Sequence, residues 1–183
     1  MILWYILIAI VAVIVFWLIG VFNGLISRRN RVDEAWSDIE VQLKRRYDLI
    51  PNLVNTVKGY AKHEEGVFTK VTAARSQAMQ ARGLAEHAQA ENMLTDTLKS
   101  LFAVAESYPD LKASNNFLHL QKELVDAEDK IQAARRFYNS QARDFNIKKE
   151  VFPNTLVAGA MGFKKFDYFD APAGAEATPE VKF

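Results

Sequence analysis

The three histidines are the side chains best suited to acid–base or metal chemistry in this chain of 183 residues. They are His63, His87 and His119. A di-iron site in a helical bundle needs a glutamate three residues before a histidine, so that both ligands lie on one face of a helix. The residues at those preceding positions are Tyr60, Leu84 and Asn116. The di-iron signature is therefore absent, and surface or helix-capping roles are expected for the histidines.

Other catalytic side chains also lack the neighbours that their chemistry needs. No second histidine follows His63 and Glu64 at the spacing of a zinc protease. Ser107 and Ser114 have no Gly-x-Ser-x-Gly context. The absence of cysteine excludes disulfides, thiolate catalysis and cysteine-ligated metals. We expect no catalytic residue, no metal and no cofactor, and an enzyme using His63 and Glu64 is the least supported hypothesis.

The most unusual local sequence is KRRYDLIPNLV, residues 44–54, in which three cations precede a proline. Apolar residues recur every three or four positions on both sides of it: Trp36, Ile39, Leu43, Ile50, Val54 and Val57. Because Pro51 has no amide hydrogen and crowds the carbonyl of Tyr47, we predict a helix kink at Pro51 that frees this carbonyl. A new helix capped by Asp48 is the alternative, although Pro51 would then occupy the third helical position and not the favoured first.

The three cations, Lys44, Arg45 and Arg46, have different expected environments. Arg46 falls on the apolar stripe between Leu43 and Ile50, so it requires a buried partner. Lys44 and Arg45 can pair with carboxylates of a neighbour or with lipid phosphates, and a solvated helix surface is the ordinary explanation for either.

A membrane span precedes this helix. Met1 to Phe22 contains no charged residue, and as a helix it would be roughly 33 Å long, against a hydrocarbon core of about 30 Å. A cleaved signal peptide is the alternative, but a basic start and a small-residue cleavage site are missing. No Lys or Arg precedes the span and three arginines follow it between residues 28 and 31, which predicts an outside N-terminus and a cytoplasmic domain. The small-xxx-small spacing of Gly20 and Gly24 predicts close packing between membrane helices.

Helix periodicity continues through the rest of the chain. After a short expected junction, residues 23–30, the spacing predicts four helices near residues 32–61, 67–82, 94–105 and 117–152. In the last helix Phe117, Leu124 and Ile131 belong to a seam suited to helix packing. No stretch shows sustained strand alternation. We therefore predict an all-α fold, an up-and-down four-helix bundle with long first and last helices.

Four segments are expected along the chain. They are a transmembrane anchor (1–26), the helical bundle (27–152), a C-terminal hook (153–170) and a disordered tail (171–183). The hook is rich in aromatic residues and is expected to pack either on the bundle or on a neighbouring subunit. Total charge is nearly balanced, with 23 Lys plus Arg against 22 Asp plus Glu, so no nucleic-acid partner is expected.

Long motifs now support a family resemblance. They are RNRVDEAWSDIEVQLKRRYDLIPNLVNTVKGYAKHE (29–64), YPDLKASNNFLHLQKEL (108–124), RRFYNSQARDFN (135–146) and FPNTLVAGAMGFKKFDYF (152–169). They closely resemble the LemA family of bacterial membrane proteins, and the match is thinnest over residues 67–106. The resemblance implies one N-terminal helix in the bacterial inner membrane followed by a helical bundle, and it brings no catalytic residues.

These observations predict a membrane-anchored scaffold that self-assembles as a homo-oligomer and organises or remodels the membrane. Its expected partners are membrane lipid and further copies of itself. The alternative is a membrane-tethered adaptor that recruits an unidentified soluble protein through the basic surface Lys44–Arg46. The candidate interface residues are Trp36, Lys44, Arg45, Arg46, Phe163, Phe166, Tyr168 and Phe169.

Overall fold

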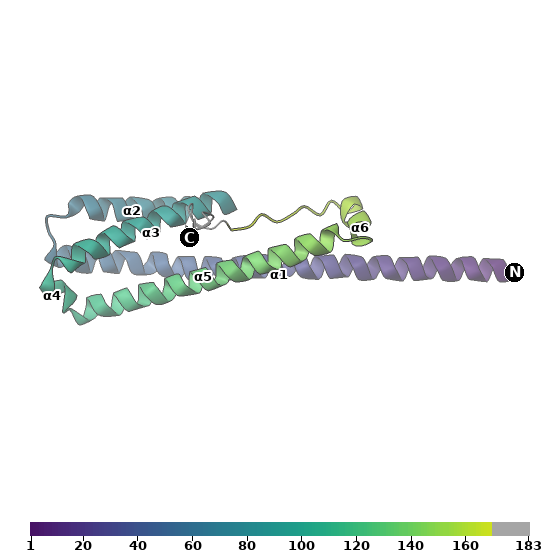
Figure 1. Cartoon of the computed structure of the whole chain (residues 1–183), viewed down its shortest axis with the longest axis horizontal. Coiled ribbons are helices and arrows are strands. Elements are labelled where there is room, and N and C mark those ends of the chain that lie inside the picture. Colours follow the sequence, from purple (N-terminus) through teal and green to yellow (C-terminus); the bar gives the residue numbers. More distant parts are fainter. Residues whose placement is uncertain (170–183) are drawn as a thin grey trace, which may run out of the picture. The chain divides into compact units, whose positions relative to one another are not determined.

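The computed structural model describes residues 1–169, so the tail expected at 171–183 lies outside the described residues. Within 1–169 the chain forms helices, turns and loops and no strand, which confirms the all-α prediction. The described chain has six helices, labelled in Figure 1, where one membrane helix and four bundle helices were expected. They are α1 (Ile2–Tyr60), α2 (Glu65–Gln80), α3 (Leu84–Glu106), α4 (Pro109–Lys112), α5 (Asn115–Glu150) and α6 (Asn154–Ala160).

Helix α1 runs without interruption through residues 23–30, where a junction was expected. The segment contains no proline, and its one strong helix breaker, Gly24, costs only about 1 kcal/mol relative to alanine. The expected boundary between anchor and bundle, at residue 26, thus falls inside a helix. α1 also continues through Pro51, so no new helix begins after Asp48.

The short helices α4 and α6 were not predicted. Each has only one or two turns, too few to show a periodic apolar pattern. Pro109 occupies the first position of α4, where a missing amide hydrogen costs nothing. α6 follows Pro153 and buries Val157 and Ala158, so tertiary packing holds it in place.

The chain divides into two compact units. Unit 1 comprises residues 1–38 and 136–168, and unit 2 comprises 39–135 with Phe169. The buried apolar residues of unit 1 come from α1, α5 and α6: Leu25, Val32, Ala35, Tyr138, Ala142, Phe145, Val157 and Ala158. Residues 1–20 of α1 are all exposed, and α1 is the one helix of the described chain long and apolar enough to cross a membrane.

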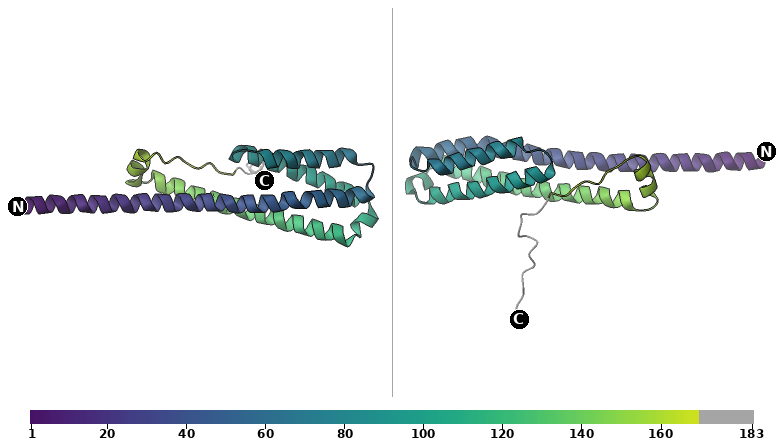
Figure 2. Two further views of the ribbon diagram at one scale, coloured as in Figure 1. Left: turned by 180° about the vertical axis from the view of Figure 1, so that it is seen from behind. Right: turned by 90° about the horizontal axis from the view of Figure 1, so that it is seen from above.

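Unit 2 is built from the later part of α1, from α2 to α4, and from the first part of α5. Helices α2 and α3 pack side by side, as both views in Figure 2 show, and Gly83 takes a positive φ of 78° in the turn between them. The core includes the expected seam residues Phe117, Leu124 and Ile131. Further buried apolar side chains come from four helices and include Ile39, Leu43, Ile50, Leu53 and Val57 of α1; Phe68, Val71, Ala74 and Ala78 of α2; Leu94, Leu98, Leu101 and Ala105 of α3; and Ala127 of α5.

Candidate functional site

The three histidines differ in exposure. His63 and His119 are exposed and His87 is half-buried. Among the described residues, no group of three or more His, Cys, Asp or Glu side chains is arranged to hold a metal ion. The histidines therefore do not define a site.

A buried charged cluster in unit 2 is the main polar feature of the fold. Arg46 of α1 is 2% exposed and forms ion pairs with Glu91 of α3 and Glu128 of α5. Its Nη1 also donates a hydrogen bond to Oγ1 of Thr95 at 3.2 Å. Arg46 thus has a buried partner in Glu91, as its position on the apolar stripe predicts, and a half-buried partner in Glu128, and these ion pairs connect α1, α3 and α5.

Further hydrogen bonds orient the two carboxylates of this cluster. The Tyr47 hydroxyl donates to Oε1 of Glu91, and Nε2 of Gln132 donates to Oε1 of Glu128 at 3.0 Å. Burial raises the pKa of Tyr47 above its usual range, so this hydroxyl stays protonated and remains a donor. Each of the two carboxylates on the Arg46 guanidinium thus also accepts a hydrogen bond from a neutral donor.

A cavity of about 260 Å³ adjoins the charged cluster. Its charged lining comprises three cations, Arg46, Lys99 and Arg135, and three anions, Glu91, Asp96 and Glu128. Burial lowers the pKa of Arg135, while Glu128 opposes that shift. The lining thus carries both signs in equal number, and the ion pairs of Arg46 beside it connect α1, α3 and α5.

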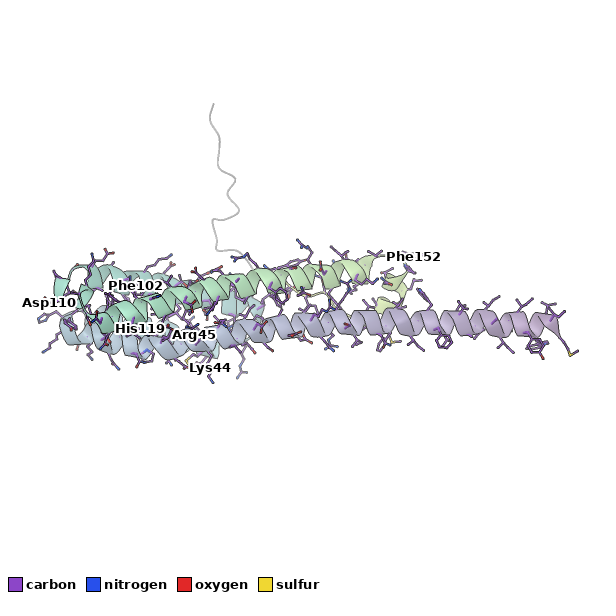
Figure 3. The ribbon with its side chains drawn as sticks, turned by 90° about the horizontal axis from the view of Figure 1, so that it is seen from below. Lys44, Arg45, Phe102, Asp110, His119 and Phe152 are labelled. Carbon is purple, nitrogen blue, oxygen red and sulfur yellow. The ribbon has the colours of Figure 1, made fainter. Side chains whose placement is uncertain are left out.

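The other two cations of the basic sequence lie in different surroundings. Arg45 is part-buried, and its Nη2 and Nη1 lie 2.5 Å and 2.7 Å from Glu123 Oε2 and Asp126 Oδ2. Lys44 is exposed. Both are labelled in Figure 3. The basic surface expected from Lys44 to Arg46 thus lacks Arg46, and Arg45 is already bound to α5.

The carbonyl freed by Pro51 also has a partner. Nε of Arg75 in α2 donates to the backbone oxygen of Tyr47 at 2.7 Å. The prediction that Pro51 frees this carbonyl therefore leads to a side-chain bond between α1 and α2. The kink at Pro51 stays a prediction.

The C-terminal hook has its own contacts within unit 1. The Phe163 ring lies 6.2 Å from Phe22 of α1 and 6.1 Å from Phe145 of α5, while Phe166 meets Phe145 edge-on at 5.1 Å. Asn146 binds the backbone of Phe166 twice, since its Nδ2 donates to the oxygen at 2.9 Å and its Oδ1 accepts from the nitrogen at 3.0 Å. The side chain of a single asparagine thus aligns the hook along α5.

The remaining aromatic candidates also have partners within this chain. Tyr138 donates to the backbone oxygen of Asp167 at 3.1 Å, and Trp36 packs edge-on against Tyr138 with a centroid distance of 5.7 Å. Burial, followed by the nearby Asp167 and Asp33, raises the pKa of Tyr138, so the hydroxyl stays a donor.

At the end of the hook, the environments of the last two aromatic residues differ. In unit 2, Phe169 is 3% exposed beneath the Arg135 guanidinium, 4.1 Å from its ring centroid. Tyr168 remains 46% exposed.

The membrane-span glycines have no close neighbour within the chain. A Cβ added at Gly20 or Gly24 would meet nothing within 4 Å. Their role in packing against another membrane helix stays a prediction.

Sequence reasoning missed Glu91 and Asn146, which are both buried polar residues. The sequence contained a signal for each of these two residues, namely its position beside an apolar residue of the same helix face. Glu91 lies one turn before the buried Leu94, and Asn146 lies one turn after the buried Ala142. A polar residue on an apolar stripe requires a partner, as it did for Arg46.

Comparisons with known proteins identify the family of the chain. The model of the LemA family matches residues 35–183. The chain is 29% identical to protein LemA of Metamycoplasma hominis, with 84% of this chain and 70% of that protein aligned. It is 25% identical to the magnetosome protein MamQ of Magnetospirillum gryphiswaldense, over 87% of this chain and 70% of MamQ. It is 26% identical to magnetosome protein MamQ 2 of Paramagnetospirillum magneticum, over 84% and 66% of the two chains. With the family model covering most of its length, this chain is a member of the LemA family.

Proposed function

We propose that the chain is a single-pass membrane-anchored helical scaffold that self-assembles at the bacterial inner membrane and organises or remodels it. The observation that carries the proposal is the continuity of α1. One helix carries both the exposed apolar residues 1–20 and Arg46, whose ion pairs connect it with α3 and α5. Such a helix joins an anchor directly to a domain core.

The names of the relatives are consistent with a structural role, because the two MamQ proteins are called magnetosome proteins and their names state no reaction. We include a structural role of this kind in the proposal for the chain. The proposal also includes an up-and-down bundle arrangement, an outside N-terminus and a cytoplasmic domain.

Exposed apolar side chains supply a surface for self-association. Leu118 and Val125 of α5 are 47% and 55% exposed, and because they lie seven residues apart they share one face of the helix. Val41 of α1 is 62% exposed. Confinement to a membrane raises the effective concentration, so weak contacts through such a face are sufficient for assembly.

The test is the native mass of the full-length chain in mild detergent, measured by light scattering and imaging beside a chain that starts at Ser27. A large, uniform particle for the full-length chain is expected. The double variant Leu118→Ser, Val125→Ser should reduce its mass, whereas the control Lys58→Gln, Lys62→Gln, at two other exposed positions, should not. Monomers or dimers in all cases would refute the scaffold.

The structure weakens the adaptor alternative, because Lys44 is the one residue of the proposed basic surface Lys44–Arg46 that is exposed. Charge reversal at Lys44 distinguishes the two functions. An adaptor would lose capture of its soluble partner with its self-association intact, while the scaffold would keep its native mass and lose nothing.

A further inference from the structure

A long uncharged sequence follows α5 and includes the first part of the hook. Residues 151–163, VFPNTLVAGAMGF, contain no charged side chain, and α6 lies at their centre. Lysines flank them on both sides: Lys148, Lys149, Lys164 and Lys165. An apolar segment between cations is typical of protein surfaces that rest in the boundary layer of a bilayer.

The position of this segment on α1 is set by an aromatic contact. The Phe163 ring lies 6.2 Å from that of Phe22, the last residue of the expected span. A cavity of about 470 Å³ beside this contact is lined by Ile26 and Arg29 of α1 together with Met161 of the segment. Figure 3 shows Phe152 at the end of α5. The segment therefore lies at the level where the apolar part of α1 ends.

That level corresponds to the headgroup layer. From Phe22 to Arg28, α1 rises roughly 9 Å at about 1.5 Å per residue. The headgroup layer on each side of a bilayer is about 5–8 Å thick, from the difference between its core and its total thickness. If α1 spans the membrane, the segment at Phe22 is in contact with this layer.

Only one side of the segment is used in the fold. Asn154, Val157 and Ala158 are buried, and Nδ2 of Asn154 donates to the backbone oxygen of Lys148 at 3.1 Å. The large apolar side chains on the other side remain exposed: Val151 by 50%, Phe152 by 75%, Leu156 by 63% and Met161 by 61%. This exposed set is unexplained by the packing of unit 1.

We propose that residues 151–163 form a second membrane contact, docked on the bilayer that α1 spans, with the flanking lysines at the phosphates of anionic phospholipids. Phe152, Leu156 and Met161 would lie between the headgroups and the acyl chains. The inference rests on the membrane anchoring of the proposed function and is independent of self-assembly.

Charge favours lipid over a second copy of the chain as the occupant of this surface. Lys165 is paired with Glu150, which leaves Lys148, Lys149 and Lys164 as an excess of positive charge around the apolar residues. Two copies meeting through this surface would bring like charges together, whereas an anionic bilayer supplies the opposite sign.

The absence of cysteine makes a depth measurement direct. A nitroxide on Leu156→Cys of the full chain is studied in nanodiscs that contain phosphatidylglycerol and hold one copy. Collision with oxygen, which concentrates in lipid, is compared with collision with a water-soluble nickel complex. Ile8→Cys in the span and Leu118→Cys on α5 are matched controls, since all three positions are exposed and apolar.

The oxygen-to-nickel collision ratio at position 156 should be severalfold higher than at 118 and lower than at 8. A ratio equal to that at 118, with position 8 in lipid, would overturn the docking while leaving the anchor intact. Shielding from both reagents in single-copy nanodiscs, or a ratio that rises only with two copies, would show a protein contact and also overturn it.

The role of the lysines is tested by replacing Lys149→Gln and Lys164→Gln together, and by nanodiscs of phosphatidylcholine alone. Both changes should lower the ratio at position 156 severalfold, and the control Lys58→Gln, Lys62→Gln should not. An unchanged ratio would overturn the assignment of the lysines to anionic headgroups. If light scattering shows a monomer while the collision ratio places position 156 in lipid, the scaffold hypothesis is rejected and the membrane docking of residues 151–163 is retained.

Discussion

Nε of Arg75 donates a hydrogen bond of 2.7 Å to the backbone oxygen of Tyr47, the carbonyl that Pro51 deprives of its helical donor. The proline therefore leaves no buried acceptor without a partner, and a side chain of α2 replaces the missing amide.

Replacing Arg75→Ala should lower the free energy of unfolding by about 1.5–3 kcal/mol, the usual effect of losing a hydrogen bond to a charged group. In a Pro51→Ala background residue 51 regains its amide hydrogen, so the same Arg75→Ala change should cost distinctly less. Urea denaturation of the four chains in detergent gives this double-mutant cycle. Equal costs in the two backgrounds would show that Arg75 does not compensate for the proline.

The Arg46 cluster predicts a large loss of stability. Arg46→Met leaves the carboxylate of Glu91 buried without its cation, and such a change costs about 3–5 kcal/mol. The neighbouring variant Lys44→Met, at an exposed position, should change stability by no more than about 0.5 kcal/mol. Adding Glu91→Gln to Arg46→Met should recover part of the loss in thermal or urea denaturation. No recovery would mean that packing, and not the unpaired charge, accounts for the effect.

The surface ion pairs of α5 predict a dependence of stability on pH. Hydrogen bonds from Lys130 and then Arg45 lower the pKa of Asp126 below its usual value. A lowered folded-state pKa gives stability that is present above the unfolded value and is lost as the pH falls through the folded one. The urea midpoint should therefore fall below about pH 4, and Asp126→Asn should weaken this fall. Lys44→Gln is the control, and an unchanged profile in Asp126→Asn would contradict the assignment.

The two bonds from Asn146 to the Phe166 backbone predict control over the hook. Asn146→Asp keeps an acceptor but loses the donor, and Asn146→Leu loses both. Release of one to two bonds, at about 1 kcal/mol each, should speed local opening roughly 5–30-fold. Tryptic cleavage after Lys164 and Lys165 measures this opening, with Tyr138→Phe, which loses the bond to Asp167, as a variant of intermediate effect. Equal cleavage rates in all chains would show that packing of the aromatic rings alone holds the hook.

Much of the fold could be predicted because it depends on regular local patterns. The apolar stripe of residues 32–61 predicts the second half of α1, and its interruption by Arg46 predicts a buried partner for this cation. The partners of Arg46 could not be predicted, because Glu91 and Glu128 are brought to it by the packing of other helices. Helix α6 was missed for a similar reason: its seven residues have little helix signal of their own, and burial of Val157 and Ala158 holds them.

The contacts of the hook likewise could not be predicted from the sequence. Sequence reasoning left its aromatic residues with two alternatives, the bundle or a neighbouring subunit. Asn146 and Phe145 align Phe166 along the same chain. The one signal in the sequence was an asparagine on an apolar stripe. Such a residue indicates a buried hydrogen-bond partner, but the sequence does not identify the backbone segment that it binds.

Because α1 runs through residues 23–30 without a break, the length of this segment fixes the rotation of the helix before it relative to the helix after it. In an α-helix each residue turns the chain by about 100°. Inserting one residue here would therefore rotate the apolar residues before it by that angle relative to the buried Val32 and Ala35, and would move Phe22 away from Phe163. A flexible linker tolerates a change in length, but here the number of residues sets the azimuth at which the lipid-facing part of the helix is presented.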